Sequence, residues 1–104
     1  EYRQLLKYPT LKAAYIDTMG RDWTNVFYRL KGAVEQIDVA KAQDAIVQVG
    51  CQGADDITLL GINAILDIVR GQNDNLNIMW GTQSGVHLPP DNIYVFVVCG
   101  YSAQ

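Results

Sequence analysis

Apolar residues recur along the chain with two spacings, and these separate predicted helices from predicted strands. Apolar side chains three and four residues apart form one stripe within residues 23–37 and another within residues 62–69, which is the pattern of a helix with one apolar face. The first contains Trp23, Phe27, Leu30, Val34 and Ile37, and the second contains Ile62, Ile65, Leu66 and Val69. We interpret the aromatic residues of the first stripe as packing on a sheet and not as a ligand-binding box.

The second predicted helix has a clear beginning and end. Asp55, Asp56 and Thr58 offer side-chain acceptors to the free N–H groups of its first turn. Arg70 suits the negative C-terminal end of the helix, and Gly71 is expected to end it in the left-handed conformation. We therefore interpret the adjacent carboxylates of Asp55 and Asp56 as helix-capping groups and not as a metal site.

Four other segments are rich in β-branched and aromatic residues and predict strands. They span residues 11–17, 45–49, 76–81 and 92–101. Gly50 and Gly53 are expected to end the second strand. The loop that contains these two glycines lacks the length and the lysine of a phosphate-binding loop, so we expect no nucleotide to bind there.

The order of these elements predicts an α/β fold of the two-layer α+β sandwich type. It has a mixed four-stranded sheet with two main helices packed on it, in the order β-α-β-α-β-β. Residues 1–7, with Pro9 shortly after them, are expected to be the end of a helix that begins upstream. The helical crossover predicts that the first two strands are parallel. The last two strands are joined by a loop alone, so we expect them to be antiparallel neighbours.

Composition and charge narrow the classes of function. The chain has 104 residues, 49% of them hydrophobic and 18% charged, which fits a single globular domain over residues 1–104. Its net charge is −3 and its basic residues form no cluster, which disfavours nucleic acid as a partner. No apolar run reaches the roughly 20 residues of a membrane span. Because the chain starts at Glu1 and shows no signal peptide, we expect it to be a fragment of a longer protein.

Few residues suit catalysis or metal binding. Cys51 and Cys99 stand outside any C-x-x-C pattern and His87 is the one histidine, so we expect no zinc site within the chain. We interpret the cysteines as reduced thiols at strand ends, which is typical of a cytoplasmic protein, while the sequence leaves a disulfide between them open. His87 lies in a proline-bounded loop without an acidic or nucleophilic neighbour, and Ser84 and Ser102 lack the strand–turn–helix setting of a nucleophile.

Several short segments carry a family resemblance when they are taken together. They are Gly53 with Asp56-Ile57-Thr58-Leu59 at the second helix, Trp80-Gly81 at the end of the third strand, and Val97-Val98-Cys99-Gly100-Tyr101 in the last strand. In order and spacing, residues 44–101 resemble the C-terminal domain of the FtsZ/tubulin superfamily, and FtsZ in particular. The chain departs from that pattern at Gly61, where the family often has a glutamate that closes a capping box. It also carries Cys51-Gln52 where the family has paired glycines.

The resemblance implies a function that belongs to a larger protein. Residues 1–8 would be the end of the central helix between the family's two domains. The domain would contact the GTP of the next subunit in a homopolymeric filament, in cell division or a cytoskeletal role. Acidic residues near that helix help to activate water, which makes Glu1 the one candidate catalytic residue here. The resemblance implies no cofactor or metal ligand within the chain, and it implies GTP and Mg²⁺ in the parent protein, whose N-terminal GTPase domain would be a partner.

An alternative reading is a stand-alone, self-associating α/β module that binds a small molecule between subunits, as trimers of the chorismate-mutase type do. That function needs basic side chains that converge on an anionic ligand. The basic residues here are scattered along the chain: Arg3, Lys7, Lys12, Arg21, Arg29, Lys31, Lys41 and Arg70. A glycine-rich G-G-G-T-G-[ST]-G segment upstream of Glu1 would decide for the FtsZ-like reading.

Overall fold

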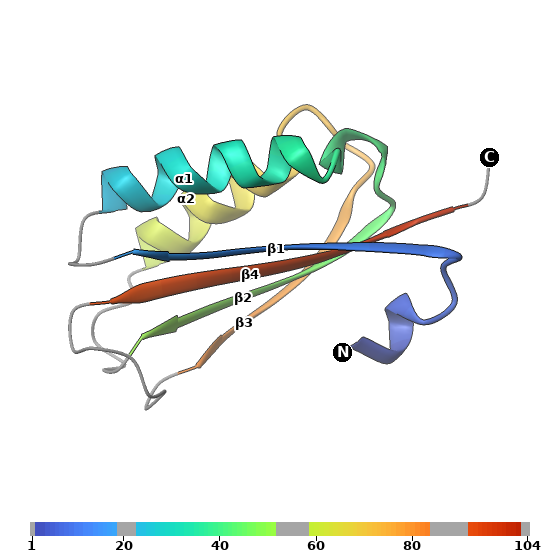
Figure 1. The fold of residues 1–104 in the computed structure, drawn as a ribbon, viewed down its shortest axis with the longest axis horizontal. Coiled ribbons are helices and arrows are strands. Elements are labelled where there is room, and N and C mark those ends of the chain that lie inside the picture. Colours follow the sequence, from blue (N-terminus) through green and yellow to red (C-terminus); the bar gives the residue numbers. More distant parts are fainter. Residues whose placement is uncertain (1, 19–22, 52–58, 84–91, 103–104) are drawn as a thin grey trace.

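The computed structural model describes residues 2–18, 23–51, 59–83 and 92–102. Its elements, in chain order, are η1 (Tyr2–Leu5), β1 (Thr10–Thr18), α1 (Trp23–Gln36), η2 (Val39–Lys41), β2 (Asp44–Cys51), α2 (Leu59–Arg70), β3 (Asn77–Gln83) and β4 (Ile93–Tyr101). The predicted fold class is confirmed, since the strands form one mixed four-stranded sheet that carries two main helices (Figure 1).

The two helices cover one face of the sheet, and the N-terminal segment lies against one end of the other face. In Figure 1, α1 and α2 lie along the same side of the sheet, and η1 lies on the opposite side. Alternate strand residues point toward the helices. The core between the layers is built from Val47, Val49, Val95, Val97 and Cys99 of the strands and from Val26, Leu30, Val34, Ile62, Ile65 and Val69 of the helices.

The strand order corrects one prediction. The order is β1-β4-β2-β3, so β3 and β4 are not neighbours, because β2 lies between them. β4 runs antiparallel to both β1 and β2, which makes β1 and β2 parallel in direction, as predicted, but separated. The composition of β4 explains its place. Its nearly continuous apolar sequence suits a central strand, and most of its residues are buried.

Gly50 also corrects a prediction, because it continues the strand that it was expected to end. Gly50 pairs with Tyr94 of β4 and with Gln83 of β3. A Cβ at position 50 would lie 1.9 Å from the ring of Tyr94. Only a glycine leaves room for the ring of Tyr94 at this position. β2 therefore continues past Gly50 to Cys51.

The helices agree with the predicted stripes except in degree of burial. Leu30, Ile62 and Ile65 are buried, whereas Phe27 and Leu66 are only half-buried beside the core. Gly71 has a φ of 55°, so the predicted left-handed helix end is confirmed. The expected capping groups Asp55, Asp56 and Thr58 lie outside the described residues. At the N-terminus the structure has the short 3-10 turn η1 where the sequence predicts the end of a longer helix.

Candidate functional site

The sheet face opposite the helices carries a row of aromatic rings that are exposed or half-buried. Tyr15 of β1 is 56% exposed. Its ring stacks on Tyr94 of β4 with centroids 5.8 Å apart and lies 6.5 Å from the ring of Phe96. Leu11 on the same strand is also exposed. These rings lie outside the core between the helices and the sheet. Apolar side chains gathered on an accessible face are typical of an interaction surface, so this open face is a candidate contact surface.

The N-terminal segment already covers one end of this open face. Leu5 of η1 is only 2% exposed, although it lies in a four-residue turn at the chain end. Tyr8 then packs against Gly100 of β4, where a Cβ would come within 2.3 Å of the tyrosine ring. The segment that leads into β1 is therefore packed onto the sheet.

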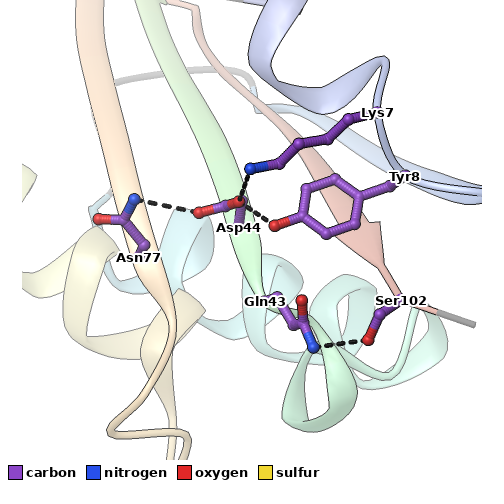
Figure 2. Close-up of polar contacts among 6 residues, drawn as sticks. All are labelled: Lys7, Tyr8, Gln43, Asp44, Asn77 and Ser102. Atoms are coloured by element: carbon purple, nitrogen blue, oxygen red, sulfur yellow. Dashed lines mark hydrogen bonds and ion pairs between the residues drawn. The ribbon is translucent and has the colours of Figure 1, made fainter.

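Asp44, the first residue of β2, is the centre of the polar contacts that fasten this segment (Figure 2). The Tyr8 hydroxyl donates a hydrogen bond to Asp44 Oδ2, and Lys7 Nζ lies 4.0 Å from the same oxygen. Asn77 Nδ2, at the start of β3, donates to Asp44 Oδ1 over 3.0 Å. The carboxylate thus links the segment between η1 and β1 to β2 and β3, and we call Lys7, Tyr8, Asp44 and Asn77 the Asp44 cluster.

The electrostatics of the Asp44 cluster suit a structural joint better than a reactive site. The hydrogen bond to Asp44, with smaller contributions from burial and the carboxylate charge, raises the pKa of Tyr8 from 10.0 to about 12. Tyr8 is therefore neutral at physiological pH and acts as a hydrogen-bond donor. Lys7 also lies 5.3 Å from the centre of the Tyr8 ring, at cation–π distance.

A second pair of side chains forms a hydrogen bond at the same end of the sheet. Gln43 Nε2 donates to Ser102 Oγ over 2.5 Å (Figure 2). The sequence gives Ser102 no nucleophile setting, and in the structure its hydroxyl oxygen accepts a hydrogen bond from this amide. Sequence reasoning missed the role of Tyr8 and Asp44. The one signal for it was Gly100, which interrupts a strong strand and makes room for the tyrosine ring.

The predicted catalytic residue cannot be placed in this site. Glu1 lies outside the described residues, as do His87 and Ser84. Cys51 and Cys99 are both buried and are not joined to each other, so the disulfide left open by the sequence is not formed. Burial raises the pKa of Cys99 to about 11, which keeps its thiol protonated and unreactive.

Several basic side chains of the described segments make contacts with residues close to them in the structure. Lys41 pairs with Asp38 at 3.7 Å. Arg29 donates to the carbonyl of Asp17 over 2.9 Å, and Arg70 donates to the carbonyl of Leu76 over 2.8 Å. Each cation is used locally, so these residues do not form a cradle for an anionic ligand. In the same segments no helix has the length and apolar character that crossing a bilayer requires.

The fold and the open face together define the class of this domain. It is a two-layer α/β domain with a mixed four-stranded sheet, two helices on one face and a segment from the N-terminal side packed on the other. No protein-family model matches the sequence, and a comparison with curated proteins finds no match.

Solved structures of FtsZ and CetZ proteins have a fold similar to that of this chain. The FtsZ dimer of M. jannaschii matches with a TM-score of 0.71 and 15% identity, over 94% of this chain and 29% of that one. Its W319Y mutant matches with a TM-score of 0.64 and 18% identity, over 88% and 28%. CetZ2 from Haloferax volcanii, described as a GTPγS-bound protofilament, matches with a TM-score of 0.63 and 12% identity, over 90% and 30%. The expected resemblance is thus confirmed for the fold, and the chain spans less than a third of those proteins.

Proposed function

We propose that this chain is the C-terminal assembly domain of an FtsZ/tubulin-like GTPase, where it contacts the nucleotide of a neighbouring subunit in a filament. The observation that carries the proposal is the fold match over 94% of this chain to an FtsZ that forms a dimer. A further match is to a CetZ protein in a protofilament. Both are assemblies of the kind that the proposed function requires.

The arrangement of charge supports a division of labour between domains. Local contacts engage four of the described basic residues: Lys7, Arg29, Lys41 and Arg70. In this proposal an N-terminal domain of the same protein binds GTP and Mg²⁺. Glu1 remains the proposed contributor to hydrolysis, in a site completed between subunits. The Asp44 cluster would serve as the mechanical joint between the preceding segment and the sheet, because it fastens the residues that follow η1 to the first residues of β2 and β3.

The first test is nucleotide binding by the 104-residue chain. Isothermal titration with GTP and Mg²⁺ should show no heat of binding at micromolar protein, because the chain lacks a phosphate-binding loop. Saturable binding of GTP would contradict the proposal and would favour the small-molecule module instead.

The second test uses the longer chain that includes an N-terminal GTPase domain. Its GTP turnover per molecule should rise with protein concentration, because each site is completed by the next subunit, and head-to-tail contacts should produce open filaments. An excess of the 104-residue chain should cap the filaments and lower turnover. The matched control is the same chain with Ile65→Asp, which places an unpaired charge in the core and should have no effect. Turnover that is independent of concentration would overturn the proposal.

A further inference from the structure

The edge strand β3 leaves a regular row of backbone groups unpaired within the described residues. β3 is the outermost strand of the sheet, next to β2 (Figure 1). The Asn77 N–H donates to the Gln43 carbonyl over 3.0 Å, which shows that Asn77 directs its backbone groups toward β2. Because backbone groups alternate along a strand, Ile78, Trp80 and Thr82 direct their N–H and C=O groups outward.

β3 also lacks the features that usually protect an edge strand. Its sequence, NIMWGTQ, contains no charged residue and no proline, and most of its residues are exposed. Trp80 lies at the centre of the strand and is 48% exposed. The opposite edge of the sheet, β1, carries Lys12 and Asp17. Charged residues on an edge discourage pairing with another chain, and uncharged edges invite it.

We propose that two copies of this chain pair antiparallel through β3, about a two-fold axis at Trp80, to form a continuous sheet across the dimer. This register joins all seven residues of β3. It sets Trp80 opposite Trp80 and Ile78 opposite Thr82. These are the residues with outward backbone groups, so each pair exchanges hydrogen bonds. An isologous contact of this kind closes after two copies, since it uses the same edge of both.

The side chains of the pair are complementary in this register. Trp80 pairs with Val47 in the sheet, so it lies on the helix-covered face, where the two indole rings would meet. On the open face, Met79 stands opposite Gly81, and a Cβ at Gly81 would have no heavy atom within 4 Å. A hollow of about 240 Å³ lies beside these residues, and the methionine of the second copy would fill it. Asn77 and Gln83 oppose each other as an uncharged amide pair.

The dimer can be tested by sedimentation of the 104-residue chain from micromolar to millimolar concentration, without nucleotide. The expected species has twice the 11.6 kDa mass of the chain. Trp80→Lys and Trp80→Glu should each sediment as monomers, because like charges then meet on the axis. An equal mixture of the two variants should recover the dimer as a Lys–Glu pair. The matched control is Tyr28→Lys on α1, at a tyrosine that is 79% exposed, and this variant should remain dimeric.

A second measurement uses the unmodified chain and does not depend on the folding of a variant. Amide hydrogen exchange at Ile78, Trp80 and Thr82 should slow as protein concentration rises, because these N–H groups become bonded in the dimer. The amides of Asn77 and Gly81 face β2 and should show no change. A monomer over the whole concentration range, a dimer that survives Trp80→Lys, or no recovery in the mixture would overturn the proposal. This proposal is independent of GTP, so its failure leaves the proposed function untouched.

Discussion

Asp44 illustrates how one residue can connect three parts of this domain. Its carboxylate accepts hydrogen bonds from Tyr8 and Asn77 and lies near the charge of Lys7. A hydrogen bond to a charged group contributes more than one between neutral groups. The tyrosine ring adds packing over Gly100, so the polar and apolar contacts of Tyr8 act on the same segment. We therefore expect Tyr8 to be the residue that holds the N-terminal segment in place.

Removal of the Tyr8 hydroxyl should show how much its hydrogen bond to Asp44 contributes to the free energy of unfolding. Tyr8→Phe keeps the ring on Gly100 and removes the bond to Asp44, with an expected loss of about 1 kcal/mol in the free energy of unfolding, since the site is only half-buried. Urea unfolding provides the measurement. Tyr28→Phe, at an exposed tyrosine on α1, is the control and should change little. Equal midpoints for all three proteins would show that the Tyr8 hydroxyl does not stabilise the fold.

The same residue predicts an alkaline loss of stability. The folded pKa of Tyr8 lies at about 12, above its ordinary value of 10.0, so the folded state favours the protonated form. The stabilisation is complete below pH 10.0 and is lost as the pH rises through about 12. The unfolding midpoint of the unmodified protein should therefore fall across this range. It should fall less steeply for Tyr8→Phe, in which the remaining decline includes that of Cys99, whose folded pKa of about 11 is also raised. Parallel curves would exclude this assignment.

The two helices each contain an internal glycine, and the structure gives the two glycines opposite roles. Gly32 of α1 is exposed, and a Cβ there would have no heavy atom within 4 Å. Gly61 of α2 is buried, and a Cβ there would come within 2.8 Å of the Trp23 ring. The family resemblance predicts a glutamate at position 61. Contact with Trp23 explains why this chain has a glycine instead.

Alanine substitutions at these two positions should shift stability in opposite directions. Gly32→Ala should raise the free energy of unfolding by up to about 1 kcal/mol, because it adds helix propensity without a clash. Gly61→Ala should lower it by about 1–2 kcal/mol, because the Trp23 ring must move. Thermal unfolding of both variants beside the unmodified chain measures the difference. A stabilising Gly61→Ala would show that α1 and α2 do not pack as described.

At the scale of the whole molecule, stability depends on the layer between the helices and the sheet. Ile65 of α2 is fully buried, whereas its neighbour Leu66 is half-buried at the edge of that layer. Cavities in a close-packed interior cost the contacts of the removed atoms. The two residues are adjacent and similar in size, so they provide a matched comparison of position.

Alanine substitution at these two positions should destabilise the domain by different amounts. Ile65→Ala should cost roughly 2–5 kcal/mol, and Leu66→Ala should cost clearly less, because part of its side chain already contacts solvent. Chemical denaturation with circular dichroism detection measures both. Equal losses would mean that the buried face of α2 is rotated from the one described here.

The sequence by itself determined the number and type of the main elements and the faces of the helices. Residues three and four apart, such as Ile62 and Ile65, reveal a helix face without knowledge of any partner, because the helical period is local. The left-handed end at Gly71 was predicted for the same reason, since it depends on one residue's own backbone.

The tertiary structure alone decided the strand order, the position at which the N-terminal segment packs on the sheet, and the extent of β2. β4 lies between β1 and β2 because its apolar sequence is best covered there, and this choice involves strands far apart in the chain. Gly50 and Gly100 resemble strand breakers in the sequence, yet each makes room for an aromatic ring. The ring over Gly100 belongs to Tyr8, at the other end of the chain. Contacts between distant residues leave no periodic signal, so the fold had to bring them together before they could be recognised.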